Sequence, residues 1–75
     1  MSFEPGAIVD FLHWPYHFRC RVLEADYGRL YHARVVIEKV FHTEFKDWVP
    51  GRIFSADDFS LTRVSALELL GEVSE

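Results

Sequence analysis

Apolar and polar residues alternate along two stretches of the chain, strictly over residues 16–22 and with one break, at Val36, over residues 31–38. The apolar members of the two stretches are Tyr16, Phe18, Cys20, Val22, Tyr31, Ala33, Val35 and Ile37. Because successive side chains leave a strand on opposite sides, this alternation predicts two strands that each bury one face. The segment 25–28 between them is interpreted as a short loop in which Gly28 supplies a positive φ. The stretch from Tyr16 to Phe41 therefore predicts one long β-hairpin.

The register of this hairpin is predicted by placing apolar residues opposite one another. Setting Glu24 across from Arg29 seats an opposite-charge pair beside the loop. The same register gives three apolar cross-strand pairs: Val22–Tyr31, Cys20–Ala33 and Phe18–Val35. We therefore expect Phe18 and Val35 to be buried and adjacent, since a slip by one residue would turn every side chain over.

A first strand is predicted over residues 7–12, before the hairpin. Val9 and Phe11 share one face of this strand, while Ile8 and Leu12 lie on the other face. A strand with apolar residues on both faces fits a small closed barrel or a contact between subunits. The strand also has few charges that would protect an exposed sheet edge.

The remaining elements are expected to be short. In chain order they are a loop at 13–15 with a partly exposed Trp14, a long loop at 41–49, a strand at 52–55, a polar turn at 56–58, a turn at 59–61, and a final strand over about 64–69. For the C-terminal segment the alternative is a helix of under two turns, because Ser65, Glu68 and Gly71 match a capping box with a C-terminal glycine. Residues 71–75 are expected to be a solvated tail.

The predicted core is made of inward-facing apolar residues. They are Val9, Phe11, Phe18, Cys20, Val22, Ala33, Val35, Ile37, Ile53 and Leu67. A chain of 75 residues forms one domain with a small core. Seven Phe, three Tyr and two Trp enlarge that core, since each large ring buries roughly 150–250 Å².

Five strands with a long central hairpin, running from Pro5-Gly6 to Leu70, resemble the SH3-like and Tudor-like small barrels. The resemblance is one of layout, and it implies an all-β, five-stranded SH3-like barrel over residues 1–75. Tudor-like modules bind methylated Lys or Arg in an aromatic cage, and no cage position of that family transfers residue by residue to this sequence. The function therefore has to be argued from the residues themselves.

Charge and cysteine content narrow the function classes. The formal net charge is −4, whereas a domain that neutralises phosphates is usually strongly basic. The single cysteine, Cys20, excludes an internal disulfide and is interpreted as a small core residue. No apolar run approaches the roughly 20 residues that span a bilayer, and the N-terminus lacks a signal sequence. We expect no membrane association and a cytoplasmic location.

The candidate binding residues are aromatic and lie in or beside predicted loops: Trp14, Tyr16, Phe45 and Trp48. Aromatic residues are enriched at interface hot spots, so these four predict contact with a protein or peptide partner. Apolar residues in excess of one small core also predict a homodimer. We expect the dimer to bury part of Ile8, Leu12, Trp14 or Trp48.

The alternative function is binding of an anion or a nucleic acid by Arg19, Arg21 and Arg34, which share the polar face of the hairpin. We favour a solvated face balanced by Glu24 and Glu38. Single-stranded nucleic acid also calls for exposed aromatic residues, and none is expected on that face.

No metal, cofactor or catalytic activity is predicted. His13, His17 and Cys20 have a spacing that metal sites use, but the three side chains should point in different directions, whereas a structural zinc site needs four converging ligands. The serines lack a nucleophile motif, and a chain of this size has little room for a closed pocket. We therefore expect a binding module and not an enzyme.

Overall fold

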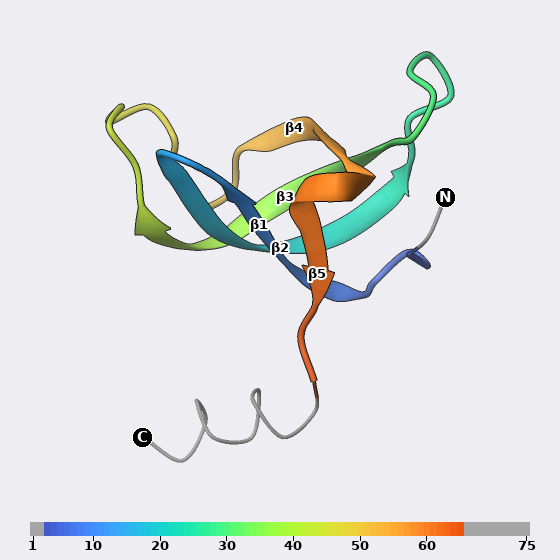
Figure 1. Ribbon diagram of the computed structural model, residues 1–75, viewed down its shortest axis with the longest axis horizontal. Helices are drawn as coiled ribbons and strands as arrows, with labels where there is room; N and C mark the ends of the chain where they lie inside the picture. Colours follow the sequence, from blue (N-terminus) through green and yellow to red (C-terminus); the bar gives the residue numbers. More distant parts are fainter. Residues whose placement is uncertain (1–2, 66–75) are drawn as a thin grey trace.

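The computed structural model describes residues 3–65, which form one antiparallel five-stranded sheet (Figure 1). The elements are β1 (Ile8–His13), β2 (Tyr16–Ala25), β3 (His32–His42), β4 (Ile53–Asp57), the 3-10 helix η1 (Asp58–Ser60) and β5 (Leu61–Arg63). The strand order is β4-β3-β2-β1-β5. The prediction of an all-β, five-stranded fold is confirmed. The predicted closure into a barrel is wrong: the sheet is curved but open, because no pairing joins β4 to β5 in the part of the chain that the structure describes.

The central hairpin is present, but its predicted register is wrong. Val22 pairs with Val35, which lies four residues beyond the predicted partner Tyr31 (35 against 31). Cys20 pairs with Ile37 and not with Ala33, again a shift of four. An even shift leaves the side chains of the paired residues on their expected face, so the assignment of the buried face holds within β2 and β3 although the pairs do not. Tyr31, which was expected on that face, lies in the loop and is 64% exposed.

The register moved because the β2–β3 loop is longer than predicted. Asp26 closes it: its backbone N–H donates to the carbonyl of His32 at 3.0 Å, and its Oδ1 accepts from Gly28 N–H at 3.0 Å. The hydroxyl of Ser55 donates to Asp26 Oδ2 at 2.6 Å and is the main cause that lowers the pKa of that carboxyl. The left-handed residue of the loop is Tyr31, with φ 61°, and not Gly28.

Two bulges in β3 extend its pairing with β2 beyond the end that the sequence pattern predicted. Arg19 pairs with Lys39 while Cys20 pairs with Ile37, so β3 holds one extra residue between these two pairs. A second shift lies at the other end of the pairing, where His17 pairs with His42 but Phe18 pairs with Val40. Phe41 is therefore a second extra residue of β3. A loop was predicted to begin at Phe41, but β3 continues through His42 because the bulges restore its pairing.

The buried core lies on one face of the curved sheet. Its members are Ala7, Val9, Phe11, Phe18, Cys20, Val22, Ala33, Val35, Ile37, Ala56, Leu61 and Val64. All predicted core residues from Val9 to Ile37 are therefore confirmed. The prediction that Ile53 belongs to the core is wrong, because Ile53 is 48% exposed and its neighbour Phe54 packs against the core instead. Leu67 lies outside the described residues.

Cys20 behaves as the core residue that was expected. Its side chain is fully buried between β1 and β3. Desolvation by this burial, with smaller effects of the Asp10 and Glu38 charges, raises the pKa of its thiol to about 12. Because only the thiolate is a good nucleophile, the thiol is unreactive near neutral pH.

The C-terminal elements differ from the prediction in their bounds. The polar turn expected at 56–58 is wrong, because Ala56 is buried and β4 runs to Asp57. The final strand is Leu61–Arg63, earlier than the expected 64–69. Most of the segment for which strand and short helix were both considered, from residue 66 onward, lies outside the described residues. Within residues 3–65 no helix is long and apolar enough to cross a bilayer.

The edges of the sheet are also not where the sequence placed them. β1 was expected to offer an unprotected edge, but it lies between β2 and β5. The edge strands are β4 and β5, and β5 is tied to the N-terminal segment by an ion pair between Arg63 and Glu4 at 2.7 Å.

Phe18→Ala is expected to unfold most of the protein. The Phe18 side chain is completely buried, and truncating such a ring costs about 3–5 kcal/mol through lost transfer energy and a cavity. A small domain has little more stability than this. Urea unfolding followed by circular dichroism checks the expectation, with Phe45→Ala, at a half-exposed ring, as the matched control. An unchanged midpoint for Phe18→Ala would contradict this account of the core.

Glu4 is expected to titrate well below an ordinary glutamate. The hydrogen bond from Arg63 is the largest cause that lowers its pKa from 4.5 to about 2. A depressed folded-state pKa means that the pair stabilises the fold above about pH 4.5, and that this contribution is lost as the pH falls towards 2. An NMR titration of the side-chain carboxyl carbon should show the low midpoint, and Arg63→Gln should raise it. A wild-type midpoint near 4.5 would mean that the pair is not formed in solution.

Candidate functional site

Three of the four aromatic residues predicted to bind a partner come together at one end of the sheet. Tyr16 begins β2, and Phe45 and Trp48 lie in the loop 43–52 between β3 and β4. The ring of Tyr16 lies 5.4 Å from that of Trp48 and 6.2 Å from that of Phe45, measured between centroids. The sequence therefore identified the residues of this cluster, although they come from separate elements.

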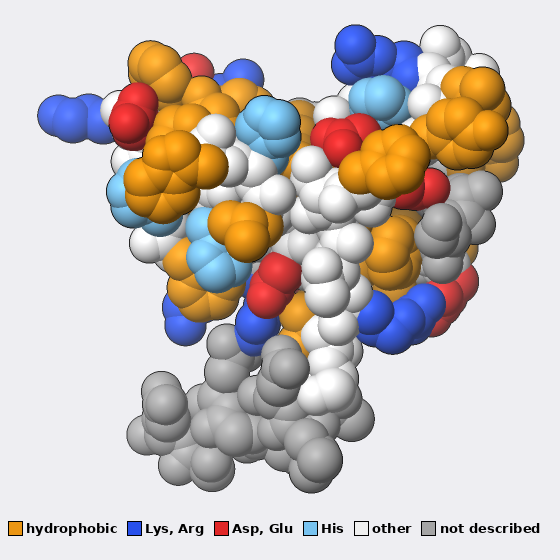
Figure 2. Space-filling view, viewed as in Figure 1, with side chains coloured by type: hydrophobic (Ala, Val, Ile, Leu, Met, Phe, Trp, Pro, Cys, Tyr) orange, Lys and Arg blue, Asp and Glu red, His pale blue; other side chains and the backbone are white. Residues whose placement is uncertain are grey.

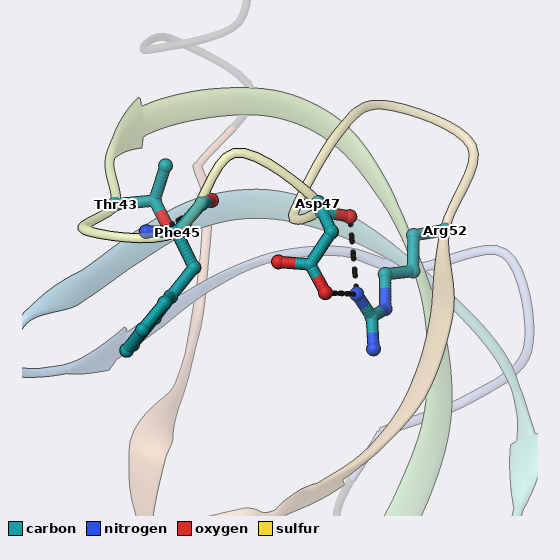
Figure 3. A network of polar contacts seen from close by, with 4 residues as sticks. All are labelled: Thr43, Phe45, Asp47 and Arg52. Atoms are coloured by element: carbon teal, nitrogen blue, oxygen red, sulfur yellow. Dashed lines mark hydrogen bonds and ion pairs between the residues drawn. The ribbon is translucent and has the colours of Figure 1, made fainter.

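The loop 43–52 is held in shape by polar contacts (Figure 3). Thr43 Oγ1 accepts from Phe45 N–H at 3.2 Å, which makes a tight turn at the start of the loop. Arg52 donates to the Asp47 carboxylate at 2.9 Å and to the Asp47 carbonyl at 3.0 Å. The first of these bonds is the main cause that lowers the pKa of Asp47. The Arg52 guanidinium also lies over the Trp48 ring, 4.1 Å from its centroid.

The cluster borders a partly open cavity of about 230 Å³. Its walls come from β1, β2, β4 and the 43–52 loop, and the lining residues are Phe11, His13, Tyr16, Phe18, Trp48, Phe54, Ser55 and Asp57. The Phe54 ring meets Trp48 edge-on at 5.3 Å and Phe11 edge-on at 5.0 Å. Rings at right angles leave space that neither ring fills, so the cavity is a consequence of how these side chains pack.

We call this space the aromatic cavity, and one of its lining residues is acidic. Asp57 ends β4, and the Ser60 hydroxyl lies 3.2 Å and 3.0 Å from its two carboxylate oxygens. This contact fixes the direction of the carboxylate. Aromatic ring faces carry partial negative charge, so rings and a carboxylate together favour a cation over an anion.

A second, larger concavity of about 400 Å³ lies at the other end of β2 and is lined by residues 25–32 alone. It is the hollow of a single loop. The aromatic cavity is smaller, but four elements build it and its walls belong partly to the core. We therefore regard the aromatic cavity as the better candidate for binding.

Trp14, the fourth predicted residue, lies apart from the aromatic cavity. It sits in the tight β1–β2 turn with 75% of its surface exposed, and its ring stacks on His42 with centroids 4.9 Å apart. His42 Nδ1 donates to the carbonyl of Pro15 at 2.6 Å, which fixes the imidazole under the indole. The exposed Trp14 was expected, but it does not join Tyr16 and Trp48.

The sequence pattern did not indicate several residues that line the aromatic cavity. Phe11 and Phe18 were assigned to the core alone, and Phe54 and Asp57 were assigned to no site. The signal that could have found Phe54 is the alternation of residues 53–57, in which Phe54 and Ala56 share one face. Ending the strand at Ser55 hid that alternation.

The polar face of the hairpin, expected to be solvated, carries ion pairs. Arg19 donates to both Asp10 carboxylate oxygens at 2.8 Å and 3.1 Å, and only 11% of its side chain is exposed. Arg21 binds Glu38 at 2.9 Å, as the charge balance of the sequence indicated. Most of the guanidinium charge of these two residues is thus neutralised within the chain.

The same face holds an aromatic residue that was not expected there. Phe41 is 40% exposed, and Arg19 and Lys39 lie 5.3 Å and 5.2 Å from its ring centroid. The prediction that this face shows no exposed aromatic residue is wrong, because Phe41 is the extra residue of a bulge and does not follow the alternation of β3.

The histidines and Cys20 point in different directions, as their spacing on strands indicated. His17 packs on Phe41 with rings 4.6 Å apart, His13 lies near Phe11 at 6.3 Å, and Cys20 is buried. Among residues 3–65 no three His, Cys, Asp or Glu side chains come together as metal ligands would.

Comparisons with known proteins give no assignment. No model of a known protein family matches the chain, and neither a curated protein nor a solved structure is detectably similar to it. The function is therefore argued from the geometry of the aromatic cavity.

Asp10→Asn is expected to destabilise the fold by about 1.5–3 kcal/mol, the range for hydrogen bonds to charged groups. The reason is that the largely buried Arg19 guanidinium loses the carboxylate that it binds through two nitrogens. Glu38→Gln, at an exposed pair, is the control and should cost under about 1 kcal/mol. Equal unfolding midpoints for the two variants in urea would contradict a structural role of the Asp10–Arg19 pair.

Proposed function

We propose that the chain is a small protein-interaction module whose aromatic cavity receives a basic side chain of a peptide partner. The observation that carries this proposal is the open cavity between Tyr16, Trp48, Phe54 and Asp57. Its aromatic walls suit the aliphatic part of an arginine or lysine side chain, and its carboxylate suits the charged end.

The size of the aromatic cavity favours a single side chain over a cofactor. Pockets for small molecules and cofactors have volumes of roughly 300–1,000 Å³. The aromatic cavity has about 230 Å³, so it is below that range. A peptide that inserts one side chain would gain further contacts from the surface around the cavity, including the half-exposed Phe45.

The charge of the site supports a cationic ligand. The chain has a net charge of −4, which attracts a basic partner at long range. Arg52 lies over the Trp48 ring, so this cluster already accommodates a guanidinium group on one of its rings. A cation over an aromatic ring contributes about 0.5–2 kcal/mol, which suits a weak, side-chain-specific contact.

The alternative is nucleic-acid binding by the outer face of the hairpin. Phe41 beside Arg19 and Lys39 favours it, because a ring next to cations is what a stacked base requires. Against it stand the net charge and the ion pairs of Arg19 and Arg21. A steep loss of binding with added salt would identify this mode. We propose no catalytic activity and no cofactor, and we propose the cytoplasm as the compartment.

Titration with N-acetyl-arginine amide and N-acetyl-lysine amide tests the aromatic cavity directly. We expect NMR shifts of the Tyr16 ring and the Trp48 indole, and smaller shifts with the neutral analogue N-acetyl-citrulline amide. Asp57→Asn should weaken binding, since it removes the acidic wall residue while keeping its shape.

Trp14→Ala is the matched control, because Trp14 is aromatic and exposed but lies outside the aromatic cavity. It should leave the titration unchanged. Equal binding of the charged and neutral probes, or loss of binding in Trp14→Ala but not in Asp57→Asn, would refute the proposal.

A further inference from the structure

A second apolar surface lies at the opposite end of the sheet from the aromatic cavity. We call it the loop patch, and it consists of Tyr27, Leu30 and Tyr31 of the β2–β3 loop with Phe59 of η1. Their exposed fractions are 92%, 80%, 64% and 90%. Figure 2 shows hydrophobic side chains gathered over this loop at the upper right and over η1 beside it.

The two parts of the loop patch are held side by side by the backbone. Asp58 N–H donates to the carbonyl of Tyr31 at 2.9 Å, and His32 pairs with Asp57 at the end of the β3–β4 ladder. η1 therefore begins next to the last residue of the loop. The loop itself is fixed by Asp26, whose carboxylate accepts from both Gly28 and Ser55. The loop patch is thus a defined surface of the folded chain.

The area of the loop patch is close to what a stable dimer needs. Three rings at these exposures offer roughly 500 Å², since a large aromatic side chain presents roughly 150–250 Å². A standard interface buries about 800 Å² on each partner. Leu30 and the polar residues around the rings supply most of the difference. The largest apolar patch of a typical monomer is about 300–600 Å² and often has a function, so the loop patch lies in the upper part of that range.

The charges around the loop patch favour a second copy of this chain. Asp26 and Arg29 lie within the loop, and Asp58 begins η1. A two-fold arrangement places the same surface on both sides, so Arg29 of each copy can approach Asp58 of the other. An anionic lipid surface would instead meet these carboxylates and a chain of net charge −4.

We infer that the loop patch is the interface of a homodimer, formed by two copies of the chain about a two-fold axis. This surface replaces the one expected around Ile8, Leu12, Trp14 and Trp48. Tyr16 and Trp48 of the aromatic cavity lie at the other end of β2 and stay accessible on both copies, while its lining residue Asp57 adjoins the loop patch. The dimer would then present two cavities, and a partner with two basic segments would bind through both.

Sedimentation equilibrium over a range of micromolar concentrations tests the interface. The wild-type chain should show twice the mass of the monomer. Tyr27→Ser with Phe59→Ser should weaken association at least about tenfold, because central aromatic residues carry most of the energy of an interface. Trp14→Ser with Phe45→Ser, at the other end of the sheet, is the matched control and should remain dimeric.

Circular dichroism establishes that the variants are folded, as expected for substitutions of exposed rings. If the double variant does not fold, Tyr27→Ser alone replaces it, since Tyr27 is the most exposed residue of the loop patch. A monomeric wild type throughout, an unweakened dimer in the folded Tyr27 and Phe59 variant, or a monomer produced by Leu12→Glu or by the control would overturn the inference. So would a monomer that binds phosphatidylserine vesicles through Phe59.

Discussion

The packing around Phe18 is the interaction on which the rest of the structure depends. Its ring is completely buried in the middle strand of the sheet and contacts Phe11, Tyr16, Trp48 and Phe54 at centroid distances of 5.7–6.0 Å. Phe11 belongs to the core, and the other three rings are partly buried against it, in β2, β4 and the 43–52 loop. The same side chain therefore supports the fold and forms the floor of the aromatic cavity. A site built on such a rigid base is preorganised for a ligand.

The period-2 pattern predicted the strands and their buried faces but not their pairing. Every predicted core residue from Val9 to Ile37 is correct, because alternation depends only on which side of a strand a residue leaves. Pairing depends on the length of the loop, which is set by hydrogen bonds of the Asp26 side chain to distant residues such as Ser55. Those tertiary contacts do not show in the local pattern. The bulge at Phe41 is likewise not visible in the local pattern. It changes the face that a residue occupies, but no change in residue type marks it in the sequence.

The candidate site was predictable in its aromatic residues and not in its full lining. Tyr16, Phe45 and Trp48 stood out as rings at predicted loops, and they do meet. Trp14 stood out in the same way, but its ring stacks on His42 and lies apart from the other three. Phe54 and Asp57 could be placed at the site only with the correct bounds of β4. The exposed Phe59 could be recognised only with the position of η1. Sequence patterns thus locate rings on strands but do not fix which rings share a cavity.

A basic side chain held between the rings of the aromatic cavity would give intermolecular nuclear Overhauser effects with those rings. Such effects between N-acetyl-arginine amide and the protein identify the rings that the ligand touches. We expect contacts from the arginine methylene protons to Tyr16, Trp48 and Phe54. Contacts confined to Phe41 and its neighbours on the outer face would show that the ligand binds elsewhere and would refute binding in the aromatic cavity.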